Sequence, residues 1–169
     1  MNTTDESRLL KDPLENQFGY QLRRAAFATI SALADSFAKL HLRLTETTFL
    51  RFVHANPGCT QSEVGRALGV KRANLVPIVN DLMANGFLER TPADGRSHAL
   101  YVTKEGGDLH RKINEIVLEH EQYFFGDLSA DERETLMRVF RSLRRKGERR
   151  DETQGGRDET QGGRRRDSR

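Results

Sequence analysis

The stretch TQSEVGRALGVKRANLVPIVNDLMANGFLERTPADGRSHALYVT, residues 60–103, decides the fold. It opens with a capping box, in which Thr60 and Glu63 each satisfy a free backbone amide at the start of a short helix, and Gly69 ends that helix. A second helix is predicted over 71–85 because its apolar residues recur at helical spacing, namely Leu75, Ile78, Val79 and Leu82. The two helices are joined by a short turn, as in a helix-turn-helix.

Two short strands follow the second helix. They are predicted over 87–91 and 97–103, and the Asp94-Gly95 pair between them suits a tight reversal. Within the second helix, Pro77 predicts a kink or a loosened first turn, because proline removes one backbone hydrogen bond. The pattern predicts a winged helix-turn-helix.

Longer amphipathic helices flank this lobe. They are predicted over 14–41, from 104 to about 126 after the capping residue Thr103, and over 130–146 after the capping residue Ser129. A shorter helix is predicted over 45–55, capped by Thr45. The fold class is therefore mainly α with a small β-hairpin wing. The long helices carry more apolar surface than one small lobe can cover, so we expect them to form a homodimer.

These elements predict one domain over 14–146, with a DNA-binding lobe at 45–103 and dimerisation helices at 14–41 and 104–146. Residues 1–13 are polar and predict a flexible N-terminus. Residues 147–169 hold the repeat Asp-Glu-Thr-Gln-Gly-Gly-Arg twice and have no large apolar side chain, so we expect a disordered tail.

Composition excludes several classes of protein. The formal net charge of the 169 residues is only +3, and no apolar run is long enough to span a membrane, so we expect a cytoplasmic protein without a membrane partner. Cys59 is the single cysteine, which excludes an internal disulfide, and we interpret it as a spectator thiol. No nucleophile motif, phosphate-binding loop or metal-ligand cluster is present, so neither an enzyme nor a cofactor is expected.

Double-stranded DNA is the partner that the helix-turn-helix predicts. Lys71, Arg72 and Asn74 stand at the start of its second helix, where side chains reach base edges or phosphates in the major groove. In the wing, Arg96 has the length to enter a minor groove, and Asp94 can hold it in place. The alternative for Asp94 and Arg96 is an ordinary solvated turn pair.

The chain resembles the MarR family of winged-helix regulators. The resemblance is carried by Thr60-Gln61-Ser62-Glu63-Val64, Asn85-Gly86-Phe87-Leu88-Glu89-Arg90, Asp94-Gly95-Arg96 and Val102-Thr103-Lys104-Glu105-Gly106. It implies a ligand-responsive transcriptional regulator, typically a repressor, that binds a palindromic operator as a homodimer. The family's wing has an acidic residue followed by two arginines, and here Gly95 replaces the first arginine, so only Arg96 is carried over.

The same resemblance implies a small-molecule effector, an aromatic anion or an aromatic acyl-CoA. Lys71-Arg72-Ala73-Asn74-Leu75-Val76-Pro77 is similar to a branch of the family that controls aromatic-acid catabolism, including regulators that answer to hydroxycinnamoyl-CoA thioesters. Arginines beside aromatic rings suit such ligands, and the candidates are Tyr20, Arg23, Arg24, Phe27, His41, Arg43 and Phe49. The alternative is that these aromatics are core residues and these arginines surface residues.

A second function also remains possible on the sequence alone. The chain would then be a winged-helix module that binds other proteins and has lost its DNA contacts. Gly95 and Asp81 are the departures from the family pattern that motivate it.

Overall fold

The computed structural model describes residues 11–92 and 98–162, with side chains described as far as residue 149. Its elements are α1 (Phe18–Ala38), α2 (Leu44–Ala55), α3 (Gln61–Leu68), α4 (Arg72–Ala84), β1 (Leu88–Pro92), β2 (His98–Val102), α5 (Lys104–Phe125) and α6 (Ala130–Gly162). The predicted fold class is confirmed: the chain is mainly helical with one antiparallel two-stranded hairpin. It divides into two compact units, the first ending at Phe124 and the second beginning at Phe125, and each is described by itself.

The capping residues that the sequence predicted start three of the helices. At α3, the Thr60 hydroxyl accepts a hydrogen bond from the Glu63 amide at 3.3 Å, and the Glu63 carboxylate accepts one from the Thr60 amide at 2.7 Å. The hydroxyls of Thr103 and Ser129 act in the same way at α5 and α6. Gly69 ends α3 with a φ of 65°, a conformation that glycine adopts without strain.

The ends of the first two helices differ from the prediction. α1 is shorter than 14–41 at both ends, and a turn follows it in which His41 has a φ of 57°. α2 begins after Arg43 rather than Thr45. The reason is that the Glu46 carboxylate accepts the Arg43 backbone amide at 2.7 Å, so this acceptor, rather than a threonine hydroxyl, fixes the start of the helix.

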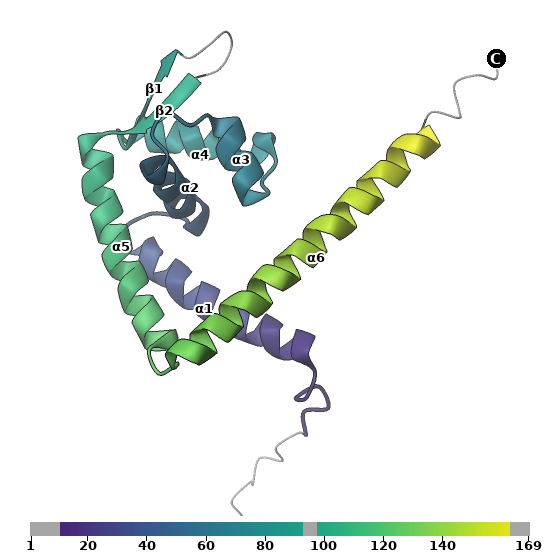
Figure 1. Ribbon diagram of the computed structural model, residues 1–169. Coiled ribbons are helices and arrows are strands. Elements are labelled where there is room, and N and C mark those ends of the chain that lie inside the picture. Colours follow the sequence, from purple (N-terminus) through teal and green to yellow (C-terminus); the bar gives the residue numbers. More distant parts are fainter. Residues whose placement is uncertain (1–10, 93–97, 163–169) are drawn as a thin grey trace, which may run out of the picture. The chain divides into compact units, whose positions relative to one another are not determined.

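The core of the first unit lies where α2, α4 and the hairpin meet. Its fully buried side chains include Phe49, Leu50, Leu75, Leu82 and Leu100. Figure 1 shows α2, α3 and α4 grouped below the hairpin, with α5 leading away from β2. Leu88 of β1 pairs with Val102 of β2, which places the hairpin directly before α5. This packing fixes the start of α4 on the surface.

α4 continues through Pro77, whose side chain is exposed. Leu75, Ile78 and Val79 on the opposite face are buried, so packing of this face holds the helix together across the missing backbone hydrogen bond. The predicted kink stays a prediction.

The second unit consists largely of α6. The sequence predicted a tail without structure from residue 147, whereas α6 runs to Gly162, and residues 163–169 lie outside the described part. A physical reason is that no proline interrupts 147–162, and Glu, Arg and Gln have good helix propensity. Within α6 none of the described side chains is buried, and Met137, Val139, Phe140 and Leu143 are all exposed.

Among the described residues, no helix is both long and apolar enough to cross a membrane.

Candidate nucleic-acid and ligand sites

The start of α4 presents polar side chains to solvent. Lys71 is the residue before the helix, and its extended backbone (φ −62°, ψ 140°) turns the chain into the first helical turn. Lys71, Arg72 and Asn74 are all exposed, while Leu75 beside them is 1% exposed and anchors the helix in the core. Three of the side chains that the sequence predicted to contact DNA therefore stand together at the start of α4.

A hollow of about 390 Å³ lies between α3 and α4 at this point. Lys71 and Arg72 line it from α4, and Arg66 lines it from α3. Sequence reasoning missed Arg66, although its place in the last turn of the first helix of the helix-turn-helix was a usable signal. Three cations and the free amides at the start of α4 can together hold phosphate groups.

Within the described residues, the side chain of Asn74 makes no hydrogen bond, and only its backbone amide is engaged, donating to the Lys71 carbonyl at 2.9 Å. Its carboxamide is therefore available to pair with a base edge. The two wing candidates, Asp94 and Arg96, lie outside the described residues.

Arg43, predicted to contact the effector, is engaged inside the lobe instead. Its guanidinium donates to Glu46 at 2.8 Å through Nε and to Asp81 of α4 at 2.8 Å through Nη2. The hydrogen bond to Glu46, followed by the attraction of both carboxylates, raises the pKa of Arg43. Arg43 thus ties the start of α2 to α4, and Asp81 has a structural partner.

Of the remaining predicted effector residues, the structure brings Tyr20, Arg23 and Arg24 together. Tyr20 of α1 lies under the guanidinium groups of Arg23 and Arg24, at 5.3 and 5.6 Å from the ring centre. Phe27 is 74% exposed and His41 is exposed, whereas Phe49 is fully buried in the core. Phe49 therefore cannot line a ligand pocket, because packing against α2 and α4 neighbours covers its ring.

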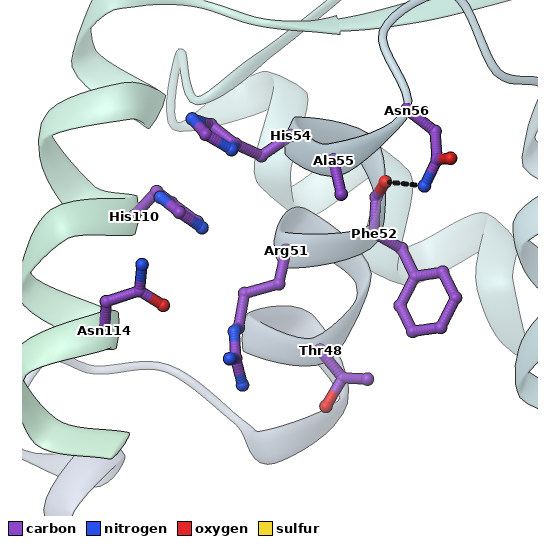
Figure 2. A pocket seen from close by; sticks show the side chains of 8 residues that line it. All are labelled: Thr48, Arg51, Phe52, His54, Ala55, Asn56, His110 and Asn114. Atoms are coloured by element: carbon purple, nitrogen blue, oxygen red, sulfur yellow. Dashed lines mark hydrogen bonds between the residues drawn. The ribbon is translucent and has the colours of Figure 1, made fainter. Parts of the chain in front are cut away.

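A pocket of about 500 Å³ lies between α1 and α5. It combines apolar side chains with Lys39, Glu119 and His120, and the His120 Nε2 lies 2.8 Å from the Thr29 carbonyl oxygen. A second pocket, of about 540 Å³, lies between α2 and α5, and Arg51, His54 and His110 line it (Figure 2). The sequence-predicted effector residues line neither pocket, because each pocket depends on side chains from two elements far apart in the chain.

The comparisons with known proteins agree with this geometry. Residues 42–97 match the model of the MarR family. The chain is 29% identical over 146 residues to a putative transcriptional regulatory protein for the hcr operon of Thauera aromatica, covering 84% of this chain and 87% of that one. Proteins of this kind are transcriptional regulators and not enzymes.

Solved structures share the fold over most of the chain. The transcriptional repressor CouR, bound to a 23-mer DNA duplex, superposes with a TM-score of 0.73 at 29% identity, covering 81% of this chain and 99% of that one. The PcaV regulator of Streptomyces coelicolor, in complex with its natural ligand, gives a TM-score of 0.67 at 24% identity, covering 80% and 96%. The resemblance that the sequence suggested is confirmed.

Proposed function

Because residues 42–97 match the model of the MarR family, we propose that the chain is a winged-helix transcriptional regulator of that family, a homodimeric repressor which binds a palindromic operator and releases it when an aromatic acid or aromatic acyl-CoA binds. One observation carries the proposal: Lys71, Arg72 and Asn74 are exposed together at the start of α4, beside the cationic hollow between α3 and α4.

The proposed docking mode follows from this placement. The start of α4 enters the major groove, Asn74 reads a base edge, and Lys71, Arg72 and Arg66 contact phosphates or guanine. Arg96, held by Asp94, contacts the adjacent minor groove from the wing. The repressor CouR, of the same fold, has been solved on a DNA duplex, which supports this mode.

Exposed apolar side chains support the homodimer. On α1, Phe18 is 96% and Phe27 is 74% exposed, and on α5, Leu118 is 69% and Tyr123 is 81% exposed. Large apolar side chains in such numbers on long helices are typical of a surface that a second copy covers.

The aromatic effector is supported by the relatives rather than by any single residue. One relative is a putative regulator for the hcr operon, and the PcaV regulator was solved with its natural ligand. On α1, the half-buried ring of Tyr20 with the exposed Arg23 and Arg24 offers an aromatic and cationic surface, and we retain these residues with Phe27 and His41 as candidates for effector contact.

The test is fluorescence anisotropy with duplex DNA from the gene's own promoter region, against random duplex DNA of equal length. We expect the promoter duplex to bind at least about a thousandfold more tightly, the lower end of specific recognition. Replacing both Lys71 and Arg72 by Gln should weaken binding to both duplexes. Arg111→Gln is the matched control, because Arg111 pairs with Asp108 on α5 and should leave binding unchanged. Equal affinity for the two duplexes would contradict operator recognition, and no binding to either duplex would instead favour the protein-binding module.

A further inference from the structure

We propose that the exposed face of α4 reads thymine methyl groups in the major groove through an apolar strip, which consists of Ala73, Val76 and Pro77. The methyl groups of the operator, and not only its hydrogen-bonding atoms, then determine which sequence is bound. That the strip meets DNA at all rests on the proposed function. Which feature of the DNA it reads does not follow from that function and is tested separately.

Helical spacing places the apolar strip on one face of α4. Ala73, Val76 and Pro77 stand at positions i, i+3 and i+4, and Asn80 at i+7 continues the same face. All four residues are exposed, and Val76 is 44% exposed. The residues of the opposite face are buried in the core, namely Leu75, Ile78, Val79 and Leu82. The apolar strip is therefore the part of α4 that is turned away from the core.

Cations surround the beginning of the apolar strip. Lys71 and Arg72 directly precede Ala73, and Arg66 of α3 lines the same hollow as these two cations. The single acidic side chain of α4, Asp81, is compensated because its Oδ2 accepts a hydrogen bond from Arg43 at 2.8 Å. A polyanion can therefore approach this face, with its phosphates on the cations and its groove against the apolar side chains.

Thymine is the base that suits an apolar side chain in the major groove. Each base pair presents donors and acceptors there, and among the four bases thymine alone adds a methyl group. Alanine, valine and proline side chains have no hydrogen-bonding atom, so a polar base edge placed against them would lose water without gaining a partner. A thymine methyl group in the same place buries apolar surface on both molecules.

A protein partner fits this face less well than DNA does. The strip consists of small side chains and is bounded by Lys71 and Arg72 at one end and by Asn80 at the other. A stable protein interface buries about 800 Å² on each partner and has a core poor in charge. Apart from Val76, the large exposed apolar side chains of the described helices lie on α1, α5 and α6.

The position of Pro77 supports a function for the same face. Proline in a helix interior removes one backbone hydrogen bond and destabilises the helix. A residue that breaks a local rule in this way is expected mainly where function requires it. Pro77 lies within the strip and is exposed, so its ring adds apolar surface where the DNA would be met.

The test is fluorescence anisotropy of the full-length protein with the promoter duplex and with the same duplex in which deoxyuridine replaces every thymidine. This replacement removes the methyl groups and keeps every hydrogen-bonding atom of the base. We expect the wild type to bind the deoxyuridine duplex at least about fourfold more weakly, the contribution of one buried methyl group. On random duplex DNA the same replacement should change the affinity by less than about twofold.

Val76→Ala should reduce the difference between the two promoter duplexes to about twofold or less, because it removes most of the apolar surface at that position. Val139→Ala is the matched control, since it makes the same substitution at a residue of α6 that is 43% exposed, and it should keep the wild-type difference. If Val76→Ala also keeps that difference, the methyl groups act through the shape of the DNA and the proposal is overturned.

The outcomes separate this inference from the proposed function. Preference for the promoter duplex without any effect of deoxyuridine would overturn the inference and leave the proposed function standing. No binding to promoter or random duplex would overturn both. A deoxyuridine effect that is lost in Val76→Ala and kept in Val139→Ala would support both.

Discussion

Asn74 is the residue on which base recognition depends in this account. Its carboxamide is exposed and unengaged at the start of α4, whereas Lys71 and Arg72 can serve phosphates. We therefore expect Asn74→Ala to cost about 1–3 kcal/mol on the promoter duplex, and far less on random DNA, measured by anisotropy. An equal loss on both duplexes would show that Asn74 does not read a base.

Gly106, at the start of α5, lies close to Phe87, the residue before β1, and to Val102 of β2. A Cβ built there would lie 2.1 Å from the Phe87 carbonyl oxygen, so the backbone must shift to accommodate any side chain. We expect Gly106→Ala to lower the free energy of unfolding by about 1–3 kcal/mol or more, measured in urea.

Gly107 provides the control, because a Cβ there meets nothing within 4 Å. Gly107→Ala should raise stability by about 0.5–1 kcal/mol through helix propensity alone. Equal effects of the two substitutions would contradict the close approach at Gly106.

At the scale of elements, α4 retains a proline in its interior. Pro77 is exposed and cannot donate a hydrogen bond to the Ala73 carbonyl, while the buried face of α4 keeps the helix in place. Pro77→Ala should restore that bond and raise the free energy of unfolding by about 1–2 kcal/mol, less than the full cost of proline because proline also restricts the unfolded chain. Unchanged or lower stability in urea would mean that the helix is already relaxed around Pro77.

The sequence predicted helix starts well where the signal is local. Thr60, Thr103 and Ser129 each cap their own helix through contacts within three residues. The start of α2 was missed because a carboxylate accepting the Arg43 backbone amide replaces the usual hydroxyl cap. The extent of α6 has no signal in apolar spacing, because the repeat lacks apolar residues and only helix propensity favours a helix there.

The candidate sites also divide into those with a local signal in the sequence and those without one. Lys71, Arg72 and Asn74 are adjacent in the chain, so their grouping on one helix end could be predicted. Arg43 with Asp81 joins residues 38 positions apart, and His54 with His110 joins α2 to α5, so neither pair has a local signal. Phe49 was a candidate for effector contact because it is aromatic, but its ring belongs to the core, as is usual for an aromatic residue at helical spacing.

For the whole molecule, the apolar side chains left exposed on the long helices predict a second copy. We expect sedimentation equilibrium to give twice the mass of the chain at micromolar concentration. Phe27→Glu, which places a charge on an exposed apolar position of α1, should weaken the dimer without unfolding the lobe. A wild-type monomer at that concentration would contradict the prediction.

In the proposed function, two copies of this winged-helix lobe read one operator. A DNase I footprint of the wild-type protein on its own promoter region tests this most directly. We predict two protected half-sites related by a two-fold axis and about one helical turn apart, roughly 34–36 Å. Both should be lost together when Lys71 and Arg72 are replaced by Gln. A single unpaired half-site, or no protection at protein concentrations that saturate random DNA, would contradict the claim.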